Sequence, residues 1–274
     1  MPAVALTDEC NLFAMVKFHR EAERRGIKPV IGADLWIGEE DERAEPARLT
    51  LLAQDLAGLQ TIETLSDHLT ELADIIVQET LPLCWETIRK RHCATPKFAV
   101  IGYGKLGGKE LGYVSDLDLV YLYDDPDPDA EENYARLGQR LNTWLSSQTS
   151  AGILFETDLR LRPNGDSGLL AVSIDSFRDY QLKSAWHWEH QALTRARFCA
   201  GDPAVGARFE KIRCEILCLP RDLAKLHEEV VAMRRKMYDA HASKSETGFN
   251  LKHDPGGIID VEFIVQYLVL GHAN

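Results

Sequence analysis

Residues 102–125 read GYGKLGGKELGYVSDLDLVYLYDD, a glycine-rich loop followed by an apolar segment that carries two acids. Asp116 and Asp118 stand two positions apart on this predicted strand. Because side chains alternate across a strand, both carboxylates are expected on one face, with Leu117 and Leu119 pointing into a core. Neighbouring carboxylates repel each other, and a divalent cation such as Mg²⁺ relieves that repulsion. A solvated strand edge is the alternative, but the apolar opposite face and the glycine loop favour a metal site.

A second acidic strand is predicted over residues 152–162, which read GILFETDLRLR. Its polar face would hold Glu156, Asp158, Arg160 and Arg162. A third carboxylate beside the first two completes a two-metal site, and we favour Asp158 over Glu156 because it lies nearer the arginines. Guanidinium groups pair bidentately with phosphate, so Arg160 and Arg162 suit a triphosphate. An ion-pair ladder on a sheet surface is the alternative.

The glycine loop matches the pattern G-x-G-x-x-G through Gly102, Gly104 and Gly107, a weak signal by itself. A dinucleotide-binding fold would need a helix next, whereas an acidic strand follows, and the P-loop pattern is absent. Glycines let backbone amides approach phosphates, and Lys105 adds a positive charge. Ser115 either donates a hydrogen bond to a phosphate or caps the strand. A structural tight turn remains the alternative for this loop.

The composition and charge of the chain argue against some classes of protein. The chain has 274 residues and a net charge of -12 without a basic block, which argues against a nucleic-acid partner. No apolar run approaches the roughly 18 residues that span a bilayer, and the N-terminal residues lack the features of a signal peptide. The six cysteines are scattered, as reduced thiols are. We therefore expect a cytoplasmic protein that has no contact with a membrane.

The remaining elements follow from hydrophobic spacing and from Gly and Pro positions. The first sixty residues read as a β-α-β unit and one more strand. Next comes a helix that Ser66 caps and Pro82 ends or bends. The sequence predicts strands at 3–6, 29–37, 49–53, 98–101, 116–123, 152–162 and 169–172, helices at 11–26, 67–91 and 131–149, and a mostly helical part from residue 176. This order indicates an α/β chain of the α+β kind.

Four segments in order resemble glutamine synthetase adenylyltransferase. They read GYGKLGGKELGYVSDLDL, FETDLRLRPNGDSGLL, AWHWEHQALTRARFCAGDP and LKHDPGGIIDVEFIVQYLVL, and the resemblance covers residues 61–274. It implies a DNA-polymerase-β-like nucleotidyltransferase sheet with flanking helices and a mostly helical C-terminal part. That family carries one domain that adds AMP and a related domain that removes it. The segments GYVSDLDL and GGIIDVEF are more similar to the adenylylating domain than to the domain that removes AMP.

The resemblance also implies a reaction. ATP would bind with its phosphates on residues 102–108, and Asp116, Asp118 and Asp158 would hold two Mg²⁺ ions. The phenolic oxygen of a tyrosine on glutamine synthetase would attack the α-phosphorus and expel diphosphate. The nitrogen-regulatory P-II protein is a further partner that the resemblance suggests. Catalysis would then consist of positioning and charge stabilisation, without a nucleophile in this chain.

Residues 1–60 differ from this pattern. They resemble the PHP domain of a bacterial replicative DNA polymerase α subunit, with Glu9 where that family often has histidine and without its paired histidines. We predict a domain of residues 1–60 and a nucleotidyltransferase domain of residues 61–274, joined near residues 59–61. Because the chain stops inside an apolar helical pattern, we interpret its C-terminal helical part as truncated.

Two other interpretations stay open at this point. The chain is a folded but inactive module that binds nucleotide or glutamine synthetase, or it is a PHP-type phosphoesterase or polymerase fragment. Two further segments are ambiguous from the residues alone. Polar side chains within residues 186–197 suit either a nucleotide pocket or a helix surface. Asp260 suits either an active site or the start of a helix.

Overall fold

The structure is a computed structural model that describes residues 3–9, 28–37, 47–53, 56–149, 152–241, 250 and 252–273. The chain forms two compact units. The first comprises Met1–Leu69, Glu110–Val114 and Val231–Val265, and the second comprises Thr70–Lys109, Ser115–Val230 and Gln266–Asn274. We call the second the sheet unit, because it holds the larger sheet and the candidate site.

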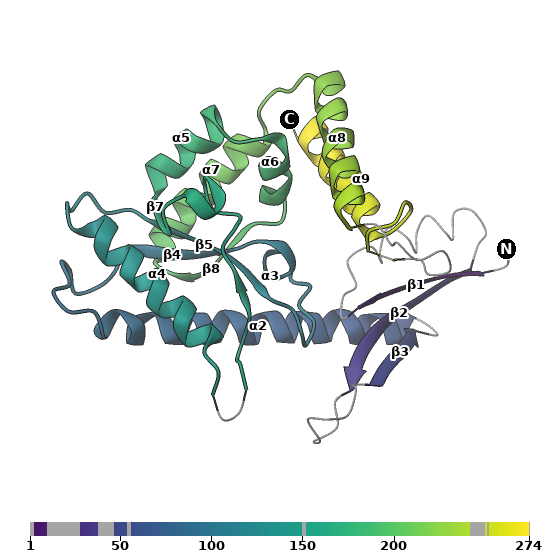
Figure 1. Ribbon diagram of the computed structural model, residues 1–274, viewed down its shortest axis with the longest axis horizontal. Coiled ribbons are helices and arrows are strands. Elements are labelled where there is room, and N and C mark those ends of the chain that lie inside the picture. Colours follow the sequence, from purple (N-terminus) through teal and green to yellow (C-terminus); the bar gives the residue numbers. More distant parts are fainter. Residues whose placement is uncertain are drawn as a thin grey trace. The chain divides into compact units, whose positions relative to one another are not determined.

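The first unit contains a three-stranded sheet in the order β1-β2-β3 (Figure 1). Its strands are β1 (Ala3–Glu9), β2 (Lys28–Ile37) and β3 (Ala47–Ala53). β1 pairs with β2 in parallel and β2 pairs with β3 antiparallel, so the three strands predicted from the sequence are confirmed. The helix predicted over residues 11–26 lies outside the described residues.

Helix α2 (Leu56–Glu86) corrects the predicted helix over residues 67–91. It begins well before Ser66, which is buried inside the helix and does not cap it, and it continues past Pro82. Leu72 and Leu83 are each 52% exposed, so these leucines do not form its buried side. The buried stripe is formed instead by residues at spacings of three and four that include smaller side chains, namely Ala73, Val77, Leu81, Cys84 and Trp85.

The sheet unit is built on a five-stranded mixed sheet in the order β6-β5-β4-β8, with β7 also pairing with β5. β5 is antiparallel to β4 and parallel to β6 and β7. This mixed sheet with flanking helices confirms the predicted fold class. Its strands are β4 (Phe98–Gly102), β5 (Leu117–Tyr123), β6 (Thr157–Asp158), β7 (Ala171–Ser173) and β8 (Arg197–Gly201).

The strand predicted over residues 152–162 is wrong in length, because only Thr157–Asp158 pairs with β5. The backbone N–H of Arg160 donates to the Asp158 carboxylate at 2.8 Å, and that of Arg162 donates to the Leu159 carbonyl at 3.3 Å. These local bonds turn the chain away from the sheet. Residues 171–173 pair in parallel with β5 instead of with residues 152–162.

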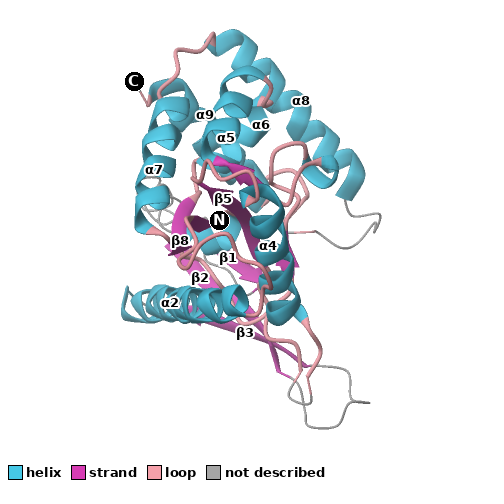
Figure 2. Ribbon diagram, turned by 90° about the vertical axis from the view of Figure 1, so that its left-hand side faces the viewer, coloured by secondary structure: helices cyan, strands magenta, loops and turns pink. Residues whose placement is uncertain are grey.

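Helices complete the chain and confirm the mostly helical part after residue 176 (Figure 2). They are α3 (Gly104–Gly108), α4 (Ala130–Ser146), α5 (Ile174–Lys183), α6 (His187–Leu193), α7 (Pro203–Leu217), α8 (Leu223–His241) and α9 (Ile258–His272), with a 3-10 turn at Gly165–Ser167. None of the helices among the described residues has the length and apolar character that crossing a membrane requires.

Aromatic side chains fill the core of the sheet unit on both faces of the sheet. Tyr134 of α4 stacks on Trp85 of α2 with ring centroids 5.5 Å apart, and it also contacts Phe98 and Tyr123 of the sheet. On the side of α5 and α7, Phe177 packs against another phenylalanine, at 5.8 Å. Because helices cover both faces, residues Leu119–Tyr123 are all buried, and the side-chain alternation expected for a one-sided strand survives only at Asp118.

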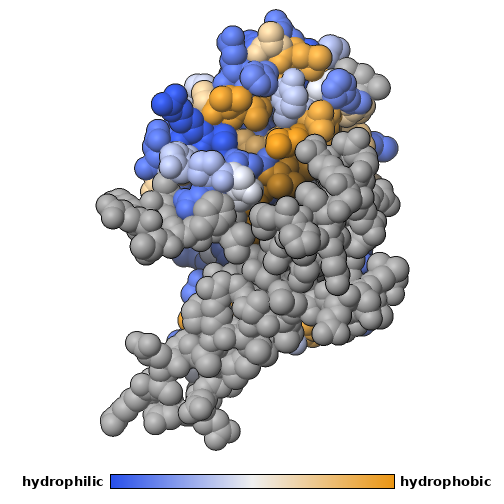
Figure 3. Space-filling view, turned by 90° about the vertical axis from the view of Figure 1, so that its right-hand side faces the viewer, coloured by the Kyte–Doolittle hydropathy of each residue, from blue (hydrophilic) through white to orange (hydrophobic). Residues whose placement is uncertain are grey.

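Polar and apolar side chains share the surface drawn in Figure 3. Helices α8 and α9 each carry exposed apolar side chains, among them Val231, Ile264 and Leu268. Scattered apolar residues are normal on a protein surface, so these side chains by themselves indicate no partner.

The domain boundary near residue 60 stays a prediction. Helix α2 runs through residues 59–61 without a break, and limited proteolysis tests whether the chain nevertheless divides there. We expect cleavage within residues 38–62 that leaves a stable C-terminal fragment, because sixty residues bury little core of their own. Resistance of that segment at protease levels that cut an exposed loop would argue against two domains.

Candidate active site

Three carboxylates come together where β5 and β6 begin the sheet. Asp118 is the second residue of β5 and faces Asp158 as its partner in the parallel register. The backbone N–H of Leu117 donates to the Glu156 carbonyl at 2.9 Å and fixes this register. Asp116 directly precedes β5 and lies close enough to act on the charge of Asp118. The structure therefore brings together the three acids that the sequence singled out, while their binding of metal stays a prediction.

Burial and like charge disfavour ionisation of Asp118. Its pKa is raised from 3.8 to about 7, first by burial and then by Asp116 and Asp158. Arg195 and Arg160 act in the opposite direction but do not cancel the effect. A divalent cation beside this carboxylate would invert the balance, because it is the largest charge in such a site.

Arg160 holds the carboxylate of Asp158. Its Nε donates to Asp158 Oδ2 at 2.9 Å, and its backbone N–H donates to Oδ1. The bonded guanidinium holds the pKa of Asp158 below its usual range. The side chain of Arg160 is 74% exposed, so it is also open to an approaching anion. Arg162 instead braces the following loop, since its Nη1 donates to the Leu159 carbonyl at 2.7 Å.

The three aspartates are not drawn up as closely as ligands of a bound ion. Across the described ranges, the ligand atoms of just one group of three potential metal ligands all lie within 4.8 Å of one another, and that group is His92, Cys93 and Asp125. Asp116 and Asp158 repel the charge of Asp118, and Asp158 is bonded to Arg160. A cation at this position would have to draw the carboxylates inward.

The glycine-rich segment forms a short helix against these acids, where a loop was predicted. Gly104 opens α3 with a φ of +49°, and a Cβ at this position would lie 2.0 Å from Asp118 Oδ2. Gly107 is confined from the other side, because a Cβ there would lie 2.1 Å from the Arg195 carbonyl oxygen. Glycine at residue 104 therefore lets the turn approach the carboxylate directly.

Substituting Gly104 with alanine is expected to lower the free energy of unfolding by about 2–4 kcal/mol, because it combines a left-handed backbone with a collision. Gly152 offers a matched control, since its φ is +103° but a Cβ there meets nothing within 4 Å. Gly152→Ala should carry only the backbone cost of about 1–2 kcal/mol. Urea unfolding of both variants measures the difference. Equal destabilisation would show that the contact between Gly104 and Asp118 is unimportant.

Arg197 supports the glycine turn from behind. Its Nε and Nη2 donate to the Leu106 carbonyl at 3.2 and 3.0 Å, and its Nη1 lies 2.7 Å from an oxygen of Asp74 on α2. The sequence left open whether this arginine lines a nucleotide pocket, and the structure gives it a bracing position. Nothing in the local pattern reveals an ion pair between residues so far apart along the chain.

Two further ambiguous residues also have local partners. Glu189 is buried and accepts hydrogen bonds from the Trp186 N–H and the Tyr180 hydroxyl, both at 2.8 Å, so it caps α6. Asp260 accepts from the Gly256 N–H at the start of α9 and pairs with an arginine of α8. Both arrangements match structural roles at helix starts.

The other residues predicted to bind the phosphates lie at the start of β5, the end that carries Asp116 and Asp118. Gly102 is the last residue of β4, and Lys105 is the second residue of α3 and is half-buried. Ser115 is buried and directly precedes Asp116. The structure thus groups these residues around the acids, and their contacts with a nucleotide stay predictions.

Comparisons with a family model and with known proteins all point to one family. A family model described as glutamate-ammonia ligase adenylyltransferase matches residues 43–212, a range that contains all three aspartates. The chain is 65% identical over 248 residues to the bifunctional glutamine synthetase adenylyltransferase/adenylyl-removing enzyme of Aromatoleum aromaticum, covering 90% of the chain and 26% of that protein. Proteins of the same name match from Nitrosomonas eutropha, at 62% identity over 82% of the chain and 24% of the relative, and from Neisseria meningitidis serogroup A, at 57% over 82% and 25%.

The chain spans about a quarter of the length of the curated relatives it matches. The family match begins at residue 43, ahead of the predicted boundary near residue 60, and continues through β4, β5 and β6 to α7. It covers more than half of the 274 residues. The chain therefore belongs to the glutamate-ammonia ligase adenylyltransferase family.

Proposed function

We propose that this chain transfers the adenylyl group of ATP to a tyrosine of glutamine synthetase and releases diphosphate. The observation that carries the proposal is the pairing of Asp118 with Asp158 on parallel strands, with Asp116 adjacent and the glycine turn against Asp118. All of these residues lie within the range that matches the family. The relatives bear the name of an enzyme that both adds and removes the adenylyl group.

The residues present suit a pair of Mg²⁺ ions. Asp118 is a partly buried carboxylate with two acidic neighbours, and its pKa is raised first by burial and then by the charges of Asp116 and Asp158. Oxygen ligands of this kind, completed by phosphate oxygens and water, are those that Mg²⁺ prefers. When bound, the ions would supply positive charge to the attacking and leaving oxygens of the displacement.

The chain's own residues would bind and orient the nucleotide. Arg160 combines an exposed guanidinium with a position beside Asp158, so it can pair with a phosphate group as it now pairs with the carboxylate. Backbone amides of the turn at residues 102–108, together with Lys105 and Ser115, would donate to the same phosphates. Arg162, held by the Leu159 carbonyl, would keep the loop beside Arg160 in place.

The reaction itself is a displacement at the α-phosphorus. A bond forms between the tyrosine oxygen of glutamine synthetase and the α-phosphorus, while the bond to the bridging oxygen of diphosphate breaks. The phenolic proton leaves to solvent or base, and diphosphate carries away the electron pair. Because the nucleophile belongs to the protein substrate, the chain contributes positioning and charge stabilisation.

The proposal also includes the direction of adenylyl transfer, the cellular compartment of the protein and a regulatory partner. We favour addition over removal of the adenylyl group, because residues 112–119 and 256–263 resemble the adenylylating domain. The thiols of the described cysteines are free, which suits the reducing cytoplasm. The P-II protein is proposed as a regulatory partner on the family resemblance alone.

An AMP-transfer assay separates this function from an inactive module. The chain is incubated with labelled ATP, Mg²⁺ and glutamine synthetase, in parallel with an Asp116→Asn/Asp118→Asn variant. Labelling of glutamine synthetase by the parent but not by the variant supports the proposal. Nucleotide binding without transfer would favour the inactive module, and a phosphoesterase activity that the double variant retains would favour the PHP-type alternative.

A further inference from the structure

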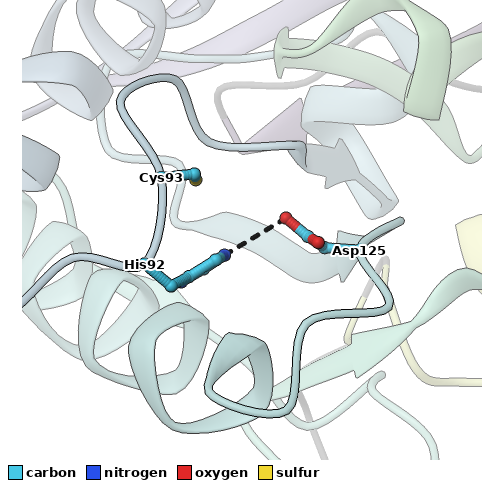
Figure 4. A group of neighbouring side chains, drawn as sticks. All are labelled: His92, Cys93 and Asp125. Atoms are coloured by element: carbon cyan, nitrogen blue, oxygen red, sulfur yellow. Dashed lines mark hydrogen bonds and ion pairs between the residues drawn. The ribbon is translucent and has the colours of Figure 1, made fainter.

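A second group of potential metal ligands lies at the opposite end of β5. His92 and Cys93 follow α2, and Asp125 follows β5 (Figure 4). His92 Nε2 lies 3.1 Å from Asp125 Oδ2, and the ligand atoms of all three residues lie within 4.8 Å of one another. Asp125 is seven positions beyond Asp118, or roughly 20 Å along an extended chain, so this group is separate from the candidate active site.

The combination of donors favours zinc. One imidazole nitrogen, one sulfur and one carboxylate oxygen are ligands that Zn²⁺ accepts together, whereas Mg²⁺ and Ca²⁺ take oxygen ligands. Bond lengths of about 2.0–2.3 Å place tetrahedral zinc ligands roughly 3.3–3.8 Å apart, close to the spacing of His92 Nε2 and Asp125 Oδ2. A thiolate and a carboxylate also balance the two positive charges of the ion.

The surroundings already orient two of the three ligands. The side chains of His92 and Asp125 are 3% and 6% exposed. The Tyr134 hydroxyl donates to Asp125 Oδ2 at 3.0 Å and accepts from the Lys97 N–H at 3.0 Å. Such second contacts fix the orientation of metal ligands.

The second nitrogen of His92 also has a neighbour. Asn133, a buried residue of α4, places its amide 3.2 Å from His92 Nδ1. A zinc ion on Nε2 requires the proton on Nδ1, which would then donate to the Asn133 amide oxygen after a half-turn of the amide. The side chain that zinc-bound histidine needs as an acceptor is therefore in place.

Cys93 supplies the remaining donor and the access route. It is half-buried, and its thiol donates to the Thr95 carbonyl at 3.2 Å. Metal binding replaces this S–H bond with a metal–sulfur bond, and the thiol proton passes to solvent. Access through a partly exposed sulfur lets an ion enter without unfolding the buried pair.

We propose that His92, Cys93 and Asp125 form a zinc-binding site, with water as the fourth ligand, that fastens the segment between α2 and β4 to the end of β5. Its three ligands come from the segments that follow α2 and β5, and Asn133 and Tyr134 of α4 contact two of them. It would stabilise the sheet unit at the end remote from the proposed catalytic acids.

Cobalt titration tests the site. The full chain carrying Asp116→Asn/Asp118→Asn, which removes the other acidic cluster, is titrated with Co²⁺ in excess Mg²⁺. We expect one equivalent to bind with a thiolate-to-cobalt charge-transfer band, which Zn²⁺ then abolishes. Cys93→Ser should remove the band, while Cys214→Ser, a change at an exposed thiol elsewhere, should retain it. Absence of the band in the starting protein, or its persistence in Cys93→Ser, would overturn the proposal.

Thiol protection provides a test that needs no variant. One equivalent of Zn²⁺ should slow alkylation of Cys93 by tenfold or more, as mass spectrometry of its peptide shows, and leave the exposed Cys214 unchanged. Equal alkylation rates of Cys93 with and without Zn²⁺ would contradict the site. Asn133→Ala should weaken Co²⁺ binding by about ten- to a hundredfold, because the histidine loses its acceptor.

Discussion

Replacing Asp118 with asparagine is expected to lower the rate of adenylyl transfer by about a thousandfold or more. Removal of one carboxylate from a two-metal site costs several kcal/mol of transition-state stabilisation, and each 1.36 kcal/mol corresponds to about a tenfold change in rate. Asparagine keeps the size of the side chain, so the glycine turn at Gly104 retains its neighbour. The loss should appear in kcat, because the carboxylate acts on the reacting centre.

Asp129→Asn is the matched control for this substitution. Asp129 is exposed in the loop before α4 and makes no side-chain cap to the helix, yet the chemical change is the same. Its transfer rate should remain within about twofold of the parent, as is usual for exposed sites. A transfer rate for Asp118→Asn within tenfold of the parent would remove Asp118 from the proposed metal site.

Asp118→Asn should also raise the free energy of unfolding when metal is absent. The pKa of Asp118 rises from 3.8 to about 7 on folding, so the folded protein binds a proton more tightly than the unfolded chain does. Its contribution to the free energy of unfolding therefore falls as pH increases from about 4 to about 7. The loss amounts to at most about 4 kcal/mol, and to less wherever water reaches the carboxyl.

Urea unfolding in EDTA measures this effect as a difference between two proteins. Asp118→Asn should be more stable than the parent at pH 8, and the two should converge near pH 4. Taking the difference between the two free energies of unfolding cancels the contributions of other titrating groups. One such group is His190, whose pKa is lowered to about 4 by burial. Mg²⁺ should reduce the difference in free energy of unfolding between the two proteins, because it stabilises the parent alone. A parent more stable than the variant at pH 8 in EDTA would contradict the repulsion among the three acids.

Alternation within strands predicted much of the candidate site. Two aspartates at positions 116 and 118, and a third in an acidic strand, sufficed to predict that these carboxylates converge, and the register of Asp118 with Asp158 confirms their proximity. The length of that second strand was wrong, because the carboxylate of Asp158 bonds to the backbone of Arg160 and ends the pairing. Side-chain bonds of this kind compete with a strand and leave no periodic signal.

Contacts between distant residues could not be predicted. The bond of Arg197 to the Leu106 carbonyl and to Asp74 depends on how α2, α3 and β8 pack, which no local pattern records. The start of α2 was misplaced for a related reason. Ser66 has the chemistry of a helix cap, but the helix begins at Leu56 and runs through Ser66, so cap chemistry alone does not set the boundary.

The most direct test of the proposed mechanism is a crystal structure of the chain with Mn²⁺ and a non-hydrolysable ATP analogue, with the metal located by its anomalous scattering. We expect manganese between Asp118 and Asp158, with Asp116 adjacent, the triphosphate against residues 102–108, and Arg160 moved from Asp158 to a phosphate. Manganese remote from all three carboxylates, or a triphosphate bound on another face of the sheet unit, would contradict the account.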